Sequence, residues 1–291
     1  MSNIKETRIN NLVVKGAPKW GGSDTRPPRG EKLFDMPFTN CYLSAKKHSG
    51  KTSNLFFILR RILGPKTKLI IYCSTVHSDA SWVFMVKYFK VKGIEMEIHT
   101  SLKENGVDLL ALKVKQLELE NEAKLAEEEG EDEEIPPEQI VKQKGTGAMN
   151  AILMHNLPPE ITGEGKKKEK KSKYNERKIV FVLDDLSTEL RSKSLVGLLK
   201  VSRHFGTVFL SSQYYLDIEP SSRLQIDYAL VYKGATEDKM EAMYKDFDLD
   251  IDYEQFEKLY ELATKEPFSF LYINVRKSEF RKNYNTKLNL E

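Results

Sequence analysis

The sequence predicts an α/β fold in which helices flank a mostly parallel central sheet. Short apolar runs recur along the chain, and several are continuously apolar and rich in Val, Ile and Phe, as strands buried on both faces are. Helical stretches separate most of these runs, and strands that alternate with helices form parallel sheets. With 291 residues, of which 40% are hydrophobic and 31% charged, the chain is long enough for one large globular domain.

The expected strands coincide with the apolar runs at residues 37–44, 69–74, 94–98, 179–183, 207–211, 228–232 and 268–275. A first helix is expected at 52–63, where Gly64-Pro65 is a normal helix stop. Further helices are expected at 187–204 and 238–246.

Two segments depart from this alternation. Residues 1–35 are polar and rich in Gly, Pro and Arg, which predicts an N-terminal arm outside the core of a domain spanning 36–291. Residues 103–178 predict a peripheral charged insertion. Its acidic block at 127–134 (EEEGEDEE) and lysine run at 166–173 (KKKEKKSK) favour partial disorder across 127–173. The lysine run is either a solvated surface or a contact for a phosphate backbone.

Bulk composition excludes several classes of protein. The formal net charge is +3, from 46 basic and 43 acidic residues, so net charge alone does not indicate a nucleic-acid partner. Cys41 and Cys73 lie in apolar runs and are expected to be buried thiols in a reducing compartment. We expect no membrane-spanning segment and no signal peptide, because the apolar runs are short. The histidines show no metal-ligand spacing and are interpreted as structural or surface residues: His48, His77, His99, His155 and His204.

The strongest chemical signal is AKKHSGKT at 45–52, between an apolar run and an apolar helix. This strand–loop–helix pattern predicts a P-loop, whose backbone N–H groups cradle phosphates. Gly50 lets phosphate approach the backbone, Lys51 reaches the β- and γ-phosphates, and the Thr52 hydroxyl is a ligand for Mg²⁺. The helix N-terminus favours the same anion. The predicted nucleotide-binding residues are Ala45, Lys46, Lys47, His48, Ser49, Gly50, Lys51, Thr52 and Ser53.

A second signal is IVFVLDD at 179–185, a buried strand whose end carries two acids. Asp184 is expected to hold Mg²⁺ directly or through water. Asp185 is expected to orient or deprotonate the attacking water, with Glu189 as the next candidate. We expect the strands that lead into the P-loop and into Asp184 to lie adjacent or near each other, with nucleotide at their C-terminal ends.

Three further residues are candidates for catalytic roles. Gln213 follows the strand TVFLSS, where it can position water beside the γ-phosphate, although a simple strand-end turn explains the pattern equally well. Arg203 and Arg223 flank this strand in the sequence. Either can serve as an arginine finger for a neighbouring subunit, with Arg203 preferred, or form a surface ion pair.

Together these motifs resemble the poxvirus-type genome-packaging ATPases of large DNA viruses and virophages, within the FtsK–HerA superfamily. The resemblance rests on AKKHSGKTSNLFFIL, LIIYCSTVHSDASW, VFVLDDL, RHFGTVFLSSQYYLDIEPSSRLQIDYALVY and FEKLYELATKEPFSFLYINVRKSEFRKNY. It covers roughly 35–100 and 179–284 and fails across 103–178. Ala45 replaces a first Gly, and Asp185 replaces a Glu, which shortens the reach to water.

The resemblance implies a RecA-like P-loop NTPase fold and an ATPase that uses ATP and Mg²⁺. It implies a homo-oligomeric ring, expected to be a hexamer, that threads double-stranded DNA into a capsid and contacts capsid proteins. The implied location is the host cytoplasm, in a virus factory, and the virion. Two alternatives stay open: an ATPase of other DNA processing, such as helicase or recombination work, and a nucleotide-binding component of capsid assembly.

Overall fold

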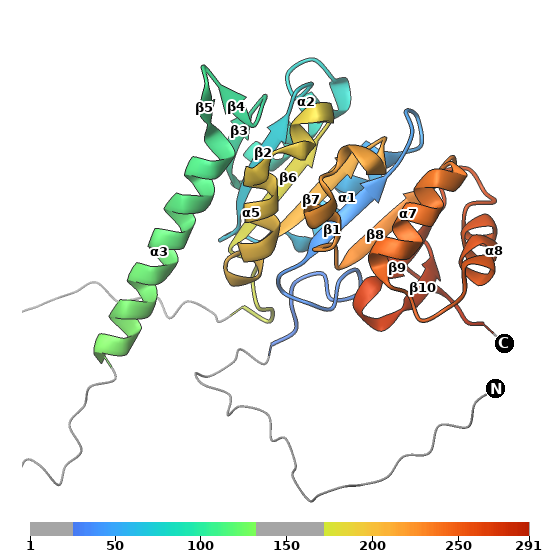
Figure 1. The fold of residues 1–291 in the computed structure, drawn as a ribbon. Coiled ribbons are helices and arrows are strands. Elements are labelled where there is room, and N and C mark those ends of the chain that lie inside the picture. Colours follow the sequence, from blue (N-terminus) through green and yellow to red (C-terminus); the bar gives the residue numbers. More distant parts are fainter. Residues whose placement is uncertain (1–25, 132–171, 291) are drawn as a thin grey trace, which may run out of the picture.

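The computed structural model describes residues 26–131 and 172–290, with only the backbone described at 124–131. Within these residues nine strands form one sheet in the order β11-β10-β9-β8-β1-β7-β6-β2-β3 (Figure 1). The strands are β1 (Asn40–Ser44), β2 (Lys68–Cys73), β3 (Glu95–His99), β6 (Ile179–Asp184), β7 (Gly206–Ser212), β8 (Tyr228–Tyr232), β9 (Phe270–Asn274), β10 (Glu279–Lys282) and β11 (Thr286–Leu288). A separate hairpin joins β4 (Lys103–Glu104) and β5 (Val107–Asp108).

The strands from β3 to β8 in this order run parallel, and β9, β10 and β11 continue the sheet antiparallel. Every residue of β1, β7 and β8 is buried, which explains why apolar or small side chains predominate in them. The exception is Asn40 at the start of β1, whose Nδ2 donates to the carbonyls of Leu199 and Gln225. The sequence prediction of an α/β fold with a mostly parallel central sheet flanked by helices is therefore confirmed.

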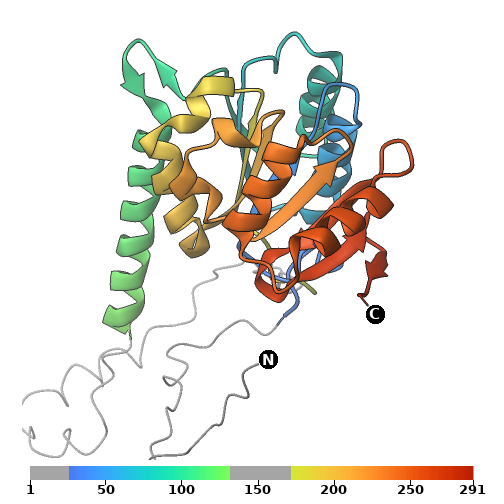
Figure 2. The same cartoon turned by 45° about the vertical axis from the view of Figure 1, so that its right-hand side comes forward.

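Helices cover both faces of the sheet (Figure 2). One face packs against α1 (Lys51–Ile62) and α2 (Ala80–Val91). The other packs against α3 (Leu109–Glu131), α5 (Lys193–Val201), α7 (Glu237–Phe247) and α8 (Tyr253–Ala263). Strand β6 shows why both faces need apolar residues: Val180 and Val182 lie in the first layer, and Phe181 and Leu183 in the second. A single turn of helix, α6 (Pro220–Arg223), precedes β8.

The predicted strands are all present, the largest difference being at the first, which begins at Asn40 rather than at residue 37. The predicted helix at 187–204 is wrong in its extent. It is divided into a 3₁₀ turn (Ser187–Arg191), α5 and a second 3₁₀ turn (Ser202–His204). The break follows from Ser192, whose extended backbone and side chain cap α5 by accepting a hydrogen bond from Leu195 N at 3.3 Å.

The predicted arm 1–35 is wrong for its last residues. Leu33 and Phe34 are buried, and the Phe34 ring packs against Phe209, Tyr228 and Tyr272. Two large apolar side chains in a polar segment are enough to attach it to the core. Residues 1–25 of the predicted arm lie outside the described residues.

The predicted insertion 103–178 is peripheral only in part. Helix α3 extends beside the sheet (Figure 1), but Leu110, Val114 and Leu117 are buried in the core layer that includes α5. At the other end, Arg177 is buried, and its Nη1 donates to Thr207 Oγ1 at 2.8 Å and to the carbonyl of Pro37. Burial lowers the pKa of the Arg177 guanidinium to about 10. The central part, 132–171, with most of the acidic block and the lysine run, lies outside the described residues.

Both thiols are buried and unbonded to each other, as the sequence predicts. Burial raises the pKa of Cys73 to about 11 and raises the pKa of Cys41 well above its usual value, so both stay protonated at neutral pH. Among the helices at 26–131 and 172–290, none has the length and apolar character needed to span a bilayer.

Candidate nucleotide-binding site

Three strand ends meet at one edge of the sheet. Because β7 lies between β1 and β6, Ser212 pairs with Ser44 on one side, and Ser211 pairs with Asp184 on the other. The loop after β1, the acids Asp184 and Asp185 at the end of β6, and Gln213 after β7 therefore converge at the C-terminal edge of the sheet. Ligands bind at this edge in open α/β sheets. They frame a cavity of about 670 Å³, lined by Ala45, Lys46, Lys47, His48, Ser49, Gly50, Lys51, Thr52, Ser53, Thr75, Ser78, Asp79, Ser81, Trp82, Asp184, Asp185, Gln213 and Phe268.

The predicted P-loop residues all line this cavity. The loop turns through positive φ at His48 (62°) and Gly50 (85°) and enters α1 directly at Lys51. The first bond along the helix runs from Asn54 N to Gly50 O at 2.9 Å. The preceding N–H groups of the helix have no intrahelical acceptor, so the helix start offers donors to an anion. This strand–loop–helix unit, set in a mostly parallel sheet, is the local arrangement that the predicted P-loop requires.

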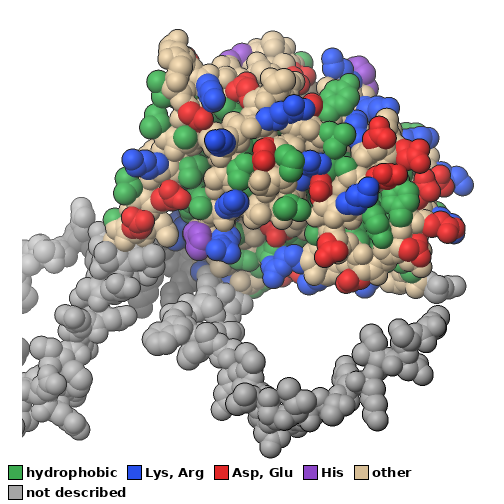
Figure 3. Space-filling view, in the orientation of Figure 1, with side chains coloured by type: hydrophobic (Ala, Val, Ile, Leu, Met, Phe, Trp, Pro, Cys, Tyr) green, Lys and Arg blue, Asp and Glu red, His purple; other side chains and the backbone are tan. Residues whose placement is uncertain are grey.

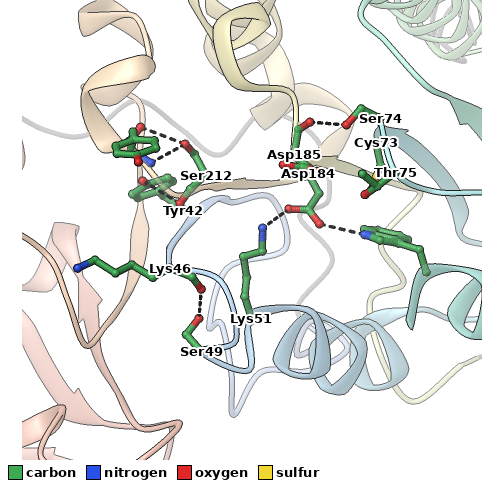
Figure 4. A network of polar contacts seen from close by, with 12 residues as sticks. Tyr42, Lys46, Ser49, Lys51, Cys73, Ser74, Thr75, Asp184, Asp185 and Ser212 are labelled. Atoms are coloured by element: carbon green, nitrogen blue, oxygen red, sulfur yellow. Dashed lines mark hydrogen bonds and ion pairs between the residues drawn. The ribbon is translucent and has the colours of Figure 1, made fainter. Parts of the chain in front are cut away.

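Lys51 and Asp184 form an ion pair in the cavity. Lys51 Nζ lies 2.6 Å from Asp184 Oδ1, and Trp82 Nε1 donates to Asp184 Oδ2 at 3.0 Å. Lys51 points from α1 toward Asp184, whereas Lys46 points away from this pair (Figure 4). The Asp184 residue is only 2% exposed, and a buried carboxylate requires such partners. The predicted proximity of Lys51 and Asp184 is confirmed.

Asp185 lies beside this pair but has a different environment. Its backbone adopts a left-handed φ of 55°, and its carbonyl accepts a hydrogen bond from Ser74 Oγ at 2.6 Å. Its side chain is half-buried and lines the cavity. The alternative base, Glu189, instead accepts hydrogen bonds from Leu102 N at 2.6 Å and Ser101 Oγ at 2.8 Å. That carboxylate anchors the segment after β3 and does not line the cavity.

Gln213 reaches the cavity from β7. Its carbonyl accepts a hydrogen bond at 3.0 Å from Lys239 Nζ, which also lies 4.5 Å from the centre of the Tyr214 ring. Burial, together with the nearby charge of Lys46, lowers the pKa of Lys239. A buried cation on α7 thus fixes the main chain at the position from which the Gln213 side chain extends.

The two candidate arginines differ in their surroundings. Arg203 is exposed at the end of β7 opposite to Gln213, and its Nε donates to the neighbouring His204 ring at 3.3 Å. Arg223 Nη1 forms an ion pair with Asp246 at 3.0 Å, and its guanidinium lies 5.2 Å from the centre of the Tyr215 ring. The Arg223 guanidinium is therefore held by contacts within the chain, whereas Arg203 is exposed on the surface.

Several residues of the site were not predicted from the sequence. Lys239 holds the carbonyl of Gln213. The cavity is also lined by Trp82, Phe268, Thr75, Ser78, Asp79 and Ser81. The Trp82 position follows from α2, whose N-terminus is capped by the Asp79 side chain through Ser81 N at 2.7 Å and Trp82 N at 3.2 Å. The letters SDAS offered this capping signal. Lys239 and Phe268 come from distant segments of the chain, and no local sequence pattern indicates that they lie near the site.

The oxygen donors of the site suit Mg²⁺. The Asp184 carboxylate and the Thr52 hydroxyl both line the cavity, and Mg²⁺ takes one or two protein oxygens together with phosphate and water. Within residues 26–131 and 172–290, no group of three or more His, Cys, Asp and Glu side chains lies together as a metal cluster. A site completed by nucleotide phosphates fits these donors better than an all-protein metal centre.

No protein-family model matches the chain, and no curated protein matches its sequence. Among solved structures, the chain is similar to the genome packaging NTPase B204 of Sulfolobus turreted icosahedral virus 2 in complex with AMP, with 14% identity, a TM-score of 0.49, and coverage of 88% of this chain and 100% of that one. It is also similar to the DNA-packaging ATPase B204 of Sulfolobus turreted icosahedral virus, with 14% identity, a TM-score of 0.44, and coverage of 84% and 97%.

A third similar structure is the cytoplasmic domain of the Thermomonospora curvata Type VII secretion ATPase EccC. Identity is 14%, the TM-score is 0.43, and the match covers 81% of this chain but 24% of that one. At these identities and TM-scores the similarities do not assign an activity, so the residues of the site must carry the functional conclusion.

Proposed function

We propose that the chain is an ATPase that hydrolyses ATP at this site and uses the reaction to move double-stranded DNA. The main support for the proposal is the ion pair between Lys51 Nζ and Asp184 Oδ1, 2.6 Å apart. Both residues line the cavity at the start of α1. A cation, a buried carboxylate and a helix N-terminus together suit a magnesium-bound triphosphate.

Each side chain has a separate task in this proposal. Lys51 exchanges the Asp184 carboxylate for the β- and γ-phosphate oxygens when ATP binds. Asp184, which accepts a hydrogen bond from Trp82 at 3.0 Å, and the Thr52 hydroxyl are the groups that would hold Mg²⁺. The metal supplies charge neutralisation at the transferring phosphoryl group.

Asp185 and Gln213 are the residues that act on water. Both line the same cavity, and a carboxylate with an amide can orient the attacking water and accept its proton. Lys239 positions Gln213 by holding its carbonyl at 3.0 Å. Because Lys239 belongs to α7, a change at Gln213 during hydrolysis has a direct path to that helix.

The DNA-translocating part of the proposal is supported by the motif resemblance to genome-packaging ATPases. It includes a homo-hexameric ring, contact with viral capsid proteins, and work in the host cytoplasm and the virion. Arg203 is proposed as the arginine finger because it is exposed. In Figure 3 acidic side chains gather over α7 and α8, so DNA is expected to contact other surfaces.

The test is steady-state ATP hydrolysis with and without DNA at low salt. Double-stranded DNA is expected to raise the rate, and added salt is expected to remove the increase, because phosphate contacts weaken with salt. Stimulation by single-stranded DNA alone would favour helicase work. If neither double-stranded nor single-stranded DNA changes the rate of ATP hydrolysis, DNA translocation would be contradicted, whereas the ATPase assignment would still hold.

A further inference from the structure

We infer that Phe268 is the platform on which the nucleobase of the bound nucleotide stacks, an inference that rests on the proposed ATPase function. Phe268 lines the nucleotide cavity and is 70% exposed. A large exposed aromatic side chain at the edge of a ligand cavity offers a flat apolar surface to a planar ring.

The backbone at Phe268 is held in an unfavourable conformation. Its φ is 62°, in the left-handed region that bulky side chains rarely occupy. It follows Pro267 in a turn closed by Ser269 N and Ser269 Oγ, which donate to Glu266 O at 3.3 and 2.6 Å. Proline followed by a residue with positive φ is the pattern of a type II turn, which normally has Gly in the second of these positions. At this position phenylalanine therefore destabilises the folded backbone relative to glycine.

The packing of the fold does not explain this choice. Phe270, two residues further on, is buried and contacts Tyr232 and Tyr284, with ring centres 5.1 Å apart in both cases. The Phe268 side chain instead remains mostly in solvent. Strained positions that contribute little to the core concentrate at ligand sites, so a ligand is the better explanation for the aromatic ring.

The position of Phe268 relative to the phosphate loop fits a base. A Cβ built on Gly50 would lie 3.1 Å from Phe268 Cδ1, so the ring lies directly over the loop. The turn precedes β9, and Phe270 pairs with Tyr232 at the C-terminal end of β8. The ring thus lies on the β8 side of the P-loop, away from Asp184 on β6. A nucleotide whose phosphates reach Lys51 and Asp184 can extend its base toward this side.

The experiment compares two ligands that share phosphates and differ in the base: a non-hydrolysable ATP analogue and inorganic tripolyphosphate, each with Mg²⁺. Phe268→Gly is expected to weaken binding of the analogue by about fivefold to a hundredfold, the range of base–aromatic stacking. Tripolyphosphate binding is expected to stay unchanged. The melting temperature is expected to hold or rise, because glycine relieves the positive φ. Phe268→Trp is expected to retain analogue binding.

Two controls make the result specific. Leu262→Ala removes another exposed apolar side chain, 55% exposed on α8, and is expected to affect neither ligand. Phe84 lies in a second groove of about 400 Å³ between α1 and α2, which also borders Thr52 and Ser53. Selective loss of analogue binding in Phe84→Ala would place the base there and overturn the inference.

Other outcomes are equally decisive. Unchanged analogue affinity in Phe268→Gly overturns the inference, as does an equal loss for both ligands, which would indicate a distorted phosphate loop. In either case Lys51→Ala, which is expected to lose both ligands, still tests the proposed function independently. A wild-type chain that binds neither ligand overturns the proposed function and this inference with it.

Discussion

Lys51 and Asp184 form an ion pair of 2.6 Å, and the same carboxylate accepts a hydrogen bond from Trp82 at 3.0 Å. Lys51 is also proposed to bind the phosphates of ATP, and Asp184 is proposed to bind Mg²⁺. Nucleotide binding must therefore separate Lys51 from Asp184. Trp82 is expected to keep its hydrogen bond to the Asp184 carboxylate while the surroundings of that carboxylate change.

Trp82 is expected to report this separation. The chain contains two tryptophans, so Trp20→Phe leaves Trp82 as the single tryptophan, which can be excited selectively over the tyrosines. Its emission is expected to change, and the change to saturate, when a non-hydrolysable ATP analogue is added with Mg²⁺. Lys51→Ala in the same background is expected to give no change at these concentrations. Binding that is detected by calorimetry without any change in Trp82 emission would show that the pair does not rearrange.

Asp184→Asn is expected to remove most of the Mg²⁺ dependence of nucleotide binding. The change removes a negative charge beside the phosphates and leaves Lys51 without its buried partner, so ATP without metal is expected to bind more tightly than to the parent. Mg²⁺ is expected to add little affinity, because a metal ligand is lost. The measurement is titration with ATP in EDTA and in Mg²⁺. A variant that keeps the parent's dependence on Mg²⁺ would remove Asp184 from the metal site.

Asp185→Asn is expected to bind ATP normally and to hydrolyse it slowly, by roughly a hundredfold to ten-thousandfold for loss of a general base. Single-turnover kinetics separate binding from hydrolysis. Glu189→Gln is the control, because Glu189 holds Leu102 N at 2.6 Å and is expected to affect stability more than chemistry. The assignment fails if Asp185→Asn hydrolyses ATP at the parent rate.

Helix α3 is expected to behave as part of the folded domain. Leu110 is fully buried, whereas Leu112 on the same helix is 56% exposed. Leu110→Ala is expected to lower the free energy of unfolding by about 2–5 kcal/mol, and Leu112→Ala by far less. Chemical denaturation of the two variants compares them directly. Equal stabilities would mean that α3 contributes nothing to the core.

Arg203 is expected to act on the nucleotide of a neighbouring subunit, where an arginine finger contributes on the order of a thousandfold in turnover. Arg203→Ala and Lys51→Ala proteins are each expected to be inactive. Mixed rings contain interfaces that join an intact P-loop to an intact finger, so mixing is expected to restore part of the activity. Full activity of Arg203→Ala alone, or no recovery in rings shown to be mixed, would exclude Arg203.

The sequence predicted the elements whose signals are local. The strand before Ala45 and the strand ending at Asp184 each stand out as an apolar run followed by its chemical residues, and their meeting at one edge follows from parallel order. Lys239 and Phe268 reach the site through tertiary packing, for which the local sequence has no signal. For Trp82 the sequence contains only the signal for the helix start, at Asp79. The predictions for residues 1–35 and 103–178 are wrong in part for a related reason. A few large apolar residues, such as Leu33 and Leu110, bury part of a segment whose average composition is polar.

The most direct test of the central claim is phosphate release from ATP in the presence of Mg²⁺, measured for the wild-type chain and for Lys51→Ala prepared in parallel. The wild type is expected to turn over ATP, and Lys51→Ala to be slower by at least about a hundredfold, because it loses a preorganised cation at the transferring phosphoryl group. Equal phosphate release from the two folded proteins would contradict the account.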